Sequence, residues 1–364
     1  MLPGLVALLA LSWLYVTQGD TTVVAGLFLG LGPAVLAIVT QAVIRIGRRA
    51  LSDVVLVAIA VAAFVFLALF GLPFPLVVLL AAVAGWALGR WWPHRMKPAG
   101  HGGDASDVAP LVPDDALHHA RPSIGRNLKI LVPGVVVWLA PVVVAATLAG
   151  RGSVYAEQGT FFAGTALVTF GGAYAVLSYV AQEAVNTYGW VSGSEMVRGL
   201  ALAETTPGPL IMVVTFVAFL GGYRDPGALD PLVGGFVAAL LTTWVTFVPC
   251  FLFIYLGAPY VERLRDNRAL SAALTGITAA VVGVIANLGL FFALKTLFAE
   301  TRELGWGPVD LLAPVWSSYS WEALAIAAVA FLLIFVRRMS VLATLAVCAV
   351  LGLALTALSG AGLA

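Results

Sequence analysis

Residues 189–223 read GWVSGSEMVRGLALAETTPGPLIMVVTFVAFLGGY, and this stretch decides the fold. Its mostly apolar text is interrupted by Thr205-Thr206-Pro207-Gly208-Pro209. Thr206 is a good helix N-cap, and Pro207 is tolerated as a first helical residue because its missing N–H needs no partner there. The pattern predicts that a helix begins at Pro207 within an apolar region, with the positive end of its dipole at the interruption.

The composition is that of a membrane protein. Of the 364 residues, 61% are hydrophobic and 10% are charged, whereas soluble proteins carry about 25% charged residues. The formal net charge of +1 excludes the basic surface typical of nucleic-acid-binding proteins. Cys250 and Cys348 lie far apart in apolar runs, which indicates two buried hydrophobic side chains and neither a disulfide nor a metal site.

Apolar segments of bilayer length predict an all-α polytopic membrane protein with about eleven transmembrane helices and broken helices among them. A span needs about 17 to 25 residues. The segments lie near residues 2–17, 22–44, 54–70, 73–89, 130–149, 160–182, 207–222, 232–260, 269–296, 321–336 and 340–358.

Residues 90–127 interrupt the series of spans. They are rich in Pro, Gly, His and Asp and have no apolar periodicity, which predicts a flexible cytoplasmic linker between residues 1–89 and 128–364. All four histidines lie in this linker, and their spacing favours no metal site. They are His94, His101, His118 and His119.

The parts on either side of the linker resemble each other. A shift of 246 residues carries Gly30 onto Gly276. After an insertion of about 21 residues, a shift of 267 carries Gly85 onto Gly352. The long constant register indicates an internal repeat.

Basic residues lie at opposite ends of matching spans in the two copies. Arg45 and Arg48 follow the second span, whereas Arg263 and Arg268 precede its counterpart. Because cytoplasmic loops are enriched in Arg and Lys, equivalent loops are expected on opposite sides of the membrane. This predicts an inverted-topology repeat, which is typical of secondary transporters.

If the repeat is as predicted, the first copy begins here at the equivalent of Val248, and we expect its upstream part to be absent from this sequence. A late start of the sequence, a natural truncation and a separate chain that supplies the missing piece would each account for this. The first is favoured because Leu2-Pro3-Gly4 reads like the middle of a span. Either a homodimer or a complex with a partner chain would complete the assembly.

Three elements of the second copy resemble the chromate ion transporter family. They are Phe170-Gly171-Gly172-Ala173-Tyr174, Tyr188-Gly189-Trp190 and the run from Gly199 to Val213. The family has two homologous halves, each with a Phe-Gly-Gly element followed by a Pro-Gly-Pro element. Residues 128–364 look like a complete second family copy, and residues 1–89 look like the C-terminal part of the first. Ser178 and Thr215 stand where the family usually has proline and glutamine.

The resemblance implies a secondary transporter that exports chromate across the plasma membrane, the inner membrane of a bacterium, and so gives chromate resistance. The residues themselves point only to an oxyanion-sized site, so a carrier of sulfate or another oxyanion stays open. A non-transporting truncated remnant or subunit stays open too. We expect no enzyme and no cofactor, since the sequence has no flavin, haem or Cys-x-x-Cys signature.

The interruption supplies the candidate substrate site. Chromate is a dianion, and its burial requires hydrogen-bond donors and positive charge. Because two prolines at the interruption lack amides, the helix dipole and the threonine hydroxyls are expected to contribute more. The candidate substrate-binding residues are Gly171, Gly172, Arg198, Thr205, Thr206, Pro207, Gly208 and Pro209.

Two charged residues next to the interruption have alternative roles. Arg198 either attracts the anion or pairs with Glu195, three residues earlier on the same helix. Ser192 and Glu195 fit a capping box. Glu204 adjoins the interruption, and an intramembrane carboxylate is functional by default, so it is predicted to couple transport to protons.

Overall fold

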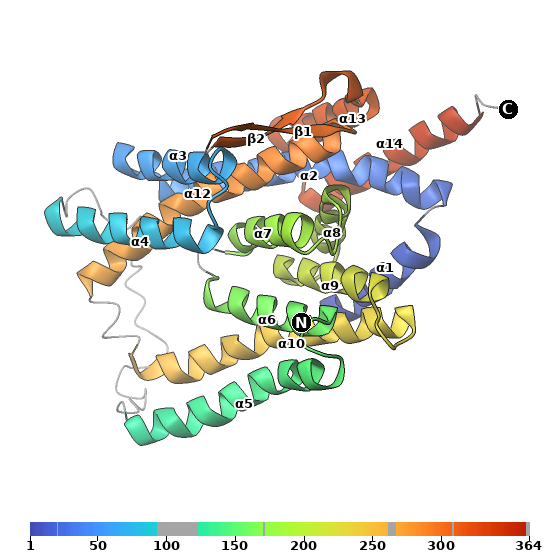
Figure 1. The fold of residues 1–364 in the computed structure, drawn as a ribbon. Coiled ribbons are helices and arrows are strands. Elements are labelled where there is room, and N and C mark those ends of the chain that lie inside the picture. Colours follow the sequence, from blue (N-terminus) through green and yellow to red (C-terminus); the bar gives the residue numbers. More distant parts are fainter. Residues whose placement is uncertain (20, 93–122, 170–171, 261–266, 308, 362–364) are drawn as a thin grey trace, which may run out of the picture.

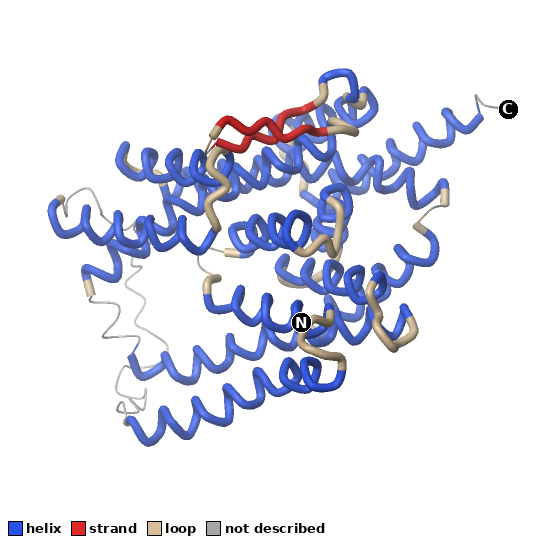
Figure 2. Tube along the Cα trace, viewed as in Figure 1, coloured by secondary structure: helices blue, strands red, loops and turns tan. Residues whose placement is uncertain are grey.

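The computed structural model describes residues 1–19, 21–92, 123–169, 172–260, 267–307 and 309–361, and these residues are almost entirely helical (Figures 1 and 2). The α-helices are α1 (Leu2–Gln18), α2 (Thr22–Ala50), α3 (Val54–Ala68), α4 (Phe74–Trp91), α5 (Ile124–Leu148), α6 (Val154–Leu167), α7 (Ala173–Gln182), α8 (Gly193–Thr205), α9 (Val213–Arg224), α10 (Pro231–Gly257), α12 (Arg268–Leu297), α13 (Trp321–Phe331) and α14 (Val341–Ala361). Short π-helices continue α7 and α13, at Glu183–Thr187 and Leu332–Val336. Short 3-10 helices lie at Leu210–Met212, Ala258–Tyr260 and Trp316–Ser318.

Eight of these helices begin at a polar residue whose side chain accepts a hydrogen bond from a first-turn amide. Such caps satisfy amides that have no partner inside the helix. The capping residues are Thr21, Asp53, Ser153, Ser192, Asp230, Asn267, Ser320 and Ser340.

Six helices of the described chain are long and apolar enough to cross a membrane: α2, α4, α5, α10 with its 3-10 extension, α12 and α14. Four further predicted spans coincide with shorter apolar helices. The predicted span 160–182 is wrong as a single helix, because α6 ends at Leu167 and α7 starts at Ala173. The count of eleven transmembrane helices therefore stays a prediction.

The helical fold also contains one β-hairpin, which was not predicted. Strands β1 (Thr301–Trp306) and β2 (Val309–Pro314) pair antiparallel, with Trp306 opposite Val309. Gly307 in the connection has φ +62°, a conformation that glycine adopts without steric cost. The hairpin lies between α12 and α13, where the sequence comparison of the two copies requires an insertion.

Two long helices form the centre of the largest packed group. Helix α12 packs on α3 and α4, α2 packs on α13 and α14, and α2 and α12 also contact each other. The closest crossings are made at glycines. A Cβ on Gly276 would lie 2.4 Å from the carbonyl oxygen of Ala81, and a Cβ on Gly30 would lie 2.0 Å from that of Cys348. Small residues of this kind let helix backbones approach closely inside a membrane.

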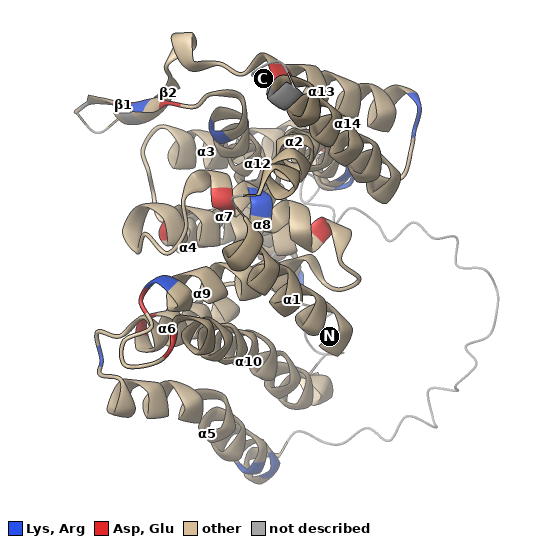
Figure 3. Cartoon of the chain, turned by 90° about the vertical axis from the view of Figure 1, so that its right-hand side faces the viewer, with Lys and Arg blue, Asp and Glu red and all other residues tan. Residues whose placement is uncertain are grey.

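Helices α5, α6, α9 and α10 form a second group, with α1 against α9 and α10 (Figure 1). Two tryptophans join α5 to α10 reciprocally. The indole of Trp138 donates to the carbonyl of Val245 at 2.8 Å, and that of Trp244 donates to the carbonyl of Val137 at 2.9 Å. Helices α7 and α8 lie between the two groups (Figure 1). Charged residues are sparse along the helices (Figure 3).

Most of the predicted linker, with its four histidines, falls outside the described residues. Helix α4 extends to Trp91, and α5 begins at Ile124, so both reach into the predicted range 90–127.

Candidate functional site

The interruption at 205–209 is present, but the predicted helix start at Thr206 and Pro207 is wrong. Thr206 is the C-terminal cap of α8, with an extended backbone at φ −94° and ψ 145°. The next helix starts as a 3-10 turn at Leu210, and α9 begins at Val213. A residue that precedes proline is disfavoured in the α region. Since Thr206 precedes Pro207 and Gly208 precedes Pro209, this pattern delays the helix to the residue after the second proline.

Both threonine hydroxyls donate hydrogen bonds to carbonyls of α8, the helix that ends here, and neither caps the helix that follows. Thr205 Oγ1 donates to the carbonyl of Leu202 at 2.8 Å, and Thr206 Oγ1 donates to the carbonyl of Ala203 at 3.0 Å. In this arrangement their hydrogens are not directed at a ligand. The start of α1 covers part of the turn, because a Cβ on Gly4 would lie 3.0 Å from the carbonyl oxygen of Pro207.

A second helix start lies beside the interruption. Gly172 precedes α7 with φ +106°, which glycine adopts without penalty, while Gly171 falls outside the described residues. Helix α7 contacts the 3-10 turn that begins at Leu210. Neither start has a side-chain cap, since the N-cap positions are Gly172 and Pro209. Both helix starts thus leave their first amides without a side-chain acceptor.

A hydrogen bond between side chains connects these two breaks. Tyr174, in the first turn of α7, donates its hydroxyl to Oε1 of Glu204 at 2.5 Å. Both side chains are partly buried. Arg45 on α2 is close enough to interact electrostatically with both of them. This bond joins the first turn of α7 to the end of α8, next to the interruption.

Arg198 lies apart from this cluster. It precedes Thr206 by eight residues on a helix that rises about 1.5 Å per residue, which is roughly 12 Å along the axis. Its guanidinium Nη1 donates to the hydroxyl of Tyr15 on α1 at 3.0 Å, and its charge lies 5.4 Å from the centre of the Phe28 ring on α2.

The predicted alternative, a pair between Arg198 and Glu195, is wrong. Glu195 forms its salt bridge with Arg224 of α9 at 2.5 Å. The capping box is confirmed: the Glu195 amide donates to the Ser192 hydroxyl, and the Ser192 amide donates to the Glu195 carboxylate. The carboxylate is oriented toward the start of its own helix, where these partners hold it.

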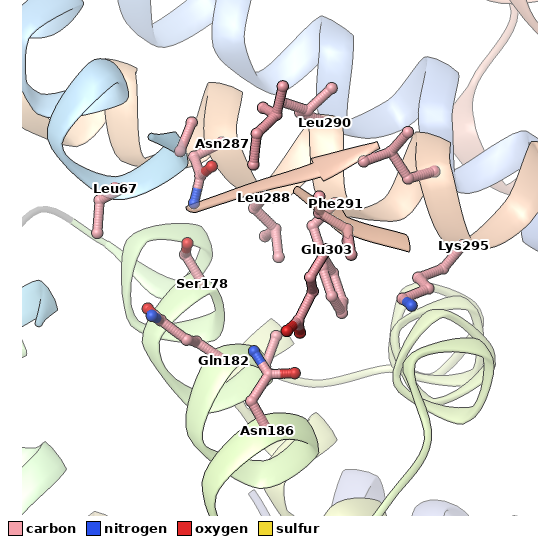
Figure 4. Close-up of a pocket in the computed structure, with 15 residues that line it drawn as sticks. Leu67, Ser178, Gln182, Asn186, Asn287, Leu288, Leu290, Phe291, Lys295 and Glu303 are labelled. Carbon is pink, nitrogen blue, oxygen red and sulfur yellow. The ribbon is translucent and has the colours of Figure 1, made fainter. Parts of the chain in front are cut away.

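A polar cavity next to α7 was missed by the sequence reasoning. It has a volume of about 210 Å³ and lies between α7 with its π-helical extension, α12 and the hairpin (Figure 4). Ser178, Gln182 and Asn186 project from one side, Asn287 from α12, and Glu303 from β1 (Figure 4). Ser178, Gln182 and Asn186 are each four residues apart, a spacing that places them on one face of a helix. This polar face within an apolar segment could have predicted the cavity from the sequence.

Comparisons with known proteins agree with the resemblance of these elements. A model of the chromate transporter family matches residues 1–86 and 156–353. A chromate transport protein of Pseudomonas aeruginosa is 32% identical over 292 residues, which is 78% of this chain and 60% of the relative. One from Cupriavidus metallidurans is 25% identical over 311 residues, 82% of this chain and 63% of the relative. An uncharacterized transporter of Bacillus subtilis is 29% identical over 154 residues, 42% of this chain and 77% of the relative.

The chain spans 60% and 63% of the length of the first two relatives. No solved structure matches the chain.

Proposed function

Because the chain belongs to the chromate transporter family, we propose that it acts in the secondary transport of chromate out of the cytoplasm, across the plasma membrane that its helices span. Export of chromate would confer chromate resistance. Transport of sulfate or another tetrahedral oxyanion is the alternative. Helix amides bind the oxygen atoms of an anion, so they do not distinguish chromate from an oxyanion of similar size and charge.

The observation that carries the proposal is the hydrogen bond from Tyr174, in the first turn of the uncapped helix α7, to Glu204, next to the break that precedes the uncapped turn at Leu210. Helix N-termini attract anions through free amides and the positive dipole end, and broken helices place such ends at membrane depth in transporters. Eight other α-helices have a side-chain acceptor for these amides, and α1, α4 and α5 start without one. The starts of α7 and of the turn at Leu210 have none, so their amides are proposed to bind the oxyanion.

We assign proton coupling to Glu204. A carboxylate next to two anion-binding helix starts repels a dianion when it is ionised, so protonation of Glu204 favours anion entry and deprotonation favours release. Tyr174, whose hydroxyl bonds the carboxylate at 2.5 Å, links this event to the first turn of α7.

The helix boundaries support the proposed internal repeat. A shift of 246 residues carries the start of α2 at Thr22 onto the start of α12 at Arg268. A shift of 267 carries the start of α4 at Phe74 onto the start of α14 at Val341. The shift of 246 residues also carries Gly30, at the crossing of α2 with α14, onto Gly276, at the crossing of α12 with α4. With the distribution of basic residues, this favours an inverted-topology arrangement.

The transport-active assembly is proposed to contain more than one copy of this chain or a separate partner chain. The chain spans about 60% of the length of its two curated relatives, and it carries one set of Phe-Gly-Gly and Pro-Gly-Pro elements. The second candidate is a chain that does not transport by itself. Native mass spectrometry of the transport-active species would show whether it contains one copy of this chain, several copies, or a second kind of chain.

The test is uptake of radioactive chromate into inverted membrane vesicles that contain the protein. We expect accumulation above that of empty vesicles, with competition by sulfate measured in parallel. Stronger competition by sulfate than by unlabelled chromate would reassign the substrate. No accumulation of either anion, with the protein present and folded, would overturn the proposed transport.

A further inference from the structure

The polar cavity of Figure 4 continues a line of polar side chains along α7. Tyr174, Ser178, Gln182 and Asn186 follow one another at intervals of four residues, which places them on one face of a helix. Tyr174 donates to Glu204 at 2.5 Å, and the other three line the cavity (Figure 4). We call these four residues the α7 stripe. The stripe connects the carboxylate at the helix break with the cavity.

Ser178 shows that the cavity holds an occupant. Its side chain is 7% exposed, and its hydroxyl forms no hydrogen bond with any described residue. Three other buried helical hydroxyls, on Ser12, Thr165 and Thr344, donate to the carbonyl four residues earlier. The Ser178 hydroxyl instead points toward Asn287, on the facing wall of the cavity (Figure 4). A buried polar group without a protein partner is expected to bond to water or a ligand.

The polar groups of the cavity are open to whatever fills it. Four side-chain atoms of the described chain are both unpartnered and sealed from solvent, and none of them belongs to a residue that lines the cavity. The side-chain amides of Gln182 and Asn287, like the Ser178 hydroxyl, form no hydrogen bond with a described residue and are not among the sealed atoms. A molecule inside the cavity can therefore bond to all three.

The size and charge of the cavity indicate that its occupant is water. Its volume of about 210 Å³ is many times the roughly 10–15 Å³ that one water requires. Hydroxyl and amide groups both donate and accept hydrogen bonds, as water does. The two charged lining residues, Glu303 and Lys295, are opposite in sign, and the Lys295 ammonium donates to Thr301 at 2.7 Å. The lining thus has no net charge that would select an ion.

The cavity leads from the exterior of the described structure to its interior. Asn186 and Glu303 are exposed, whereas Ser178 is buried. Tyr174 lies four residues before Ser178, which is about 6 Å along the helix. Because O–H···O bonds span about 2.7–2.8 Å, one bridging water is enough to connect the two hydroxyls. A continuous line of hydrogen bonds can therefore reach Glu204 from the exposed end.

We propose that the cavity and the α7 stripe form a water-filled proton path to Glu204. Tyr174 transfers its hydroxyl proton to Oε1 of Glu204 and takes a proton from the adjacent water, which is replenished along the chain of waters. In sum, one hydronium ion at the exposed end becomes water and the carboxylate becomes a carboxylic acid. The reverse sequence releases the proton.

Gln182 and Ser178 have the positioning role in this path, since they hold the waters. Among the described residues, Tyr174 of α7 and Arg45 of α2 act electrostatically on Glu204, while Glu303 and Lys295 border the cavity. The path rests on the proposed proton coupling by Glu204. It adds a requirement that this coupling alone does not contain, namely water between α7 and α12.

The first experiment tests for water at Ser178. Ser178→Cys is made in the full chain after Cys250 and Cys348, the two native cysteines, have been replaced by alanine. A small water-soluble methanethiosulfonate should modify Ser178→Cys but not Ser12→Cys, because Ser12 is fully buried and lines no cavity described above. Modification of the exposed Asn186→Cys but not of Ser178→Cys would overturn the path.

The second experiment measures the initial rate of radioactive chromate uptake into inverted vesicles, in H₂O and in D₂O. Gln182→Leu and Ser178→Val make the cavity apolar. Since positioned groups accelerate proton transfer by factors of about 10²–10⁴, we expect uptake to fall by about tenfold or more and the solvent isotope effect to increase. Thr165→Val is the matched control, because it also removes a buried hydroxyl, but one that bonds the carbonyl of Phe161. It should transport like the unmodified protein.

Equilibrium binding separates a path from an anion site. A path sets how fast Glu204 is protonated and not how completely, so calorimetry at one pH should give the same chromate affinity for Gln182→Leu, Ser178→Val and the unmodified protein. Weaker binding would assign these residues to the anion and overturn the path. Unchanged uptake rates in both variants, with a flattened pH profile in Glu204→Gln, would overturn the path alone. An unchanged pH profile in Glu204→Gln would overturn the proton coupling and the path together.

Discussion

The crossing of α12 over α4 makes a quantitative prediction for Gly276→Ala. The added Cβ would lie 2.4 Å from the Ala81 carbonyl oxygen, whereas ordinary contacts begin at 3.4 Å, so the two backbones must separate by about 1 Å. Overpacking of this kind costs about 1–3 kcal/mol. The matched control is Gly289→Ala on the same helix, where the Cβ would meet Val39 at 3.4 Å. There the helix gains up to about 1 kcal/mol, because alanine has the higher helix propensity.

The gain in helix propensity applies to both substitutions and cancels, so they should differ by the overpacking cost of about 1–3 kcal/mol in the free energy of unfolding. The assay is thermal unfolding of both purified variants in one detergent, followed by tryptophan fluorescence. Gly276→Ala should unfold at a lower temperature than the unmodified protein, and Gly289→Ala at the same or a higher temperature. Equal midpoints for the two variants would refute the close approach of α12 and α4.

Three further predictions concern the helix breaks. Glu204→Gln should flatten the pH dependence of chromate uptake in vesicles, and an unchanged profile would remove Glu204 from proton coupling. Tyr174→Phe should decrease uptake about tenfold or more, because it deletes a hydrogen bond to a carboxylate; uptake at the original rate would contradict this. Gly172→Ala should destabilise the protein by about 1–3 kcal/mol because of its positive φ, measured against Gly164→Ala, which has open space around it.

The sequence was sufficient to locate the break but not the start of the next helix. Prolines at 207 and 209 are visible in the sequence, and so is the interruption they cause. Thr206 can cap either a helix that starts or a helix that ends, and the local residues do not decide between them. In the structure its hydroxyl bonds the carbonyl of Ala203, because the extended conformation before Pro207 ends α8 there.

Contacts between distant helices were beyond the reach of sequence periodicity. The capping box of Ser192 and Glu195 is local and was predicted correctly. The salt bridge from Glu195 to Arg224 joins α8 to α9, and the bond from Arg198 to Tyr15 joins α8 to α1. Such partners depend on how the helices pack, so the nearest residue of opposite charge in sequence was the wrong choice.

The hairpin was missed for a related reason. Residues 301–314 alternate only weakly between polar and apolar side chains and include Gly307. Within a mostly apolar chain they read as a loop between two spans, because an isolated pair of strands has marginal stability without packing against another element. Here β2 contacts α3, which supplies that packing.

The reciprocal packing of the central helices restricts how the molecule can move. Since α12 is held against α3 and α4 while α2 is held against α13 and α14, the segments before and after residue 200 cannot swing apart as two rigid bodies without opening both glycine crossings. Alternating access would then require the α5, α6, α9 and α10 group to slide or tilt against this interlocked frame. Helices α7 and α8 lie along that boundary (Figure 1) and would be displaced first. Glu204, the start of α7 and the turn at Leu210 would move with them.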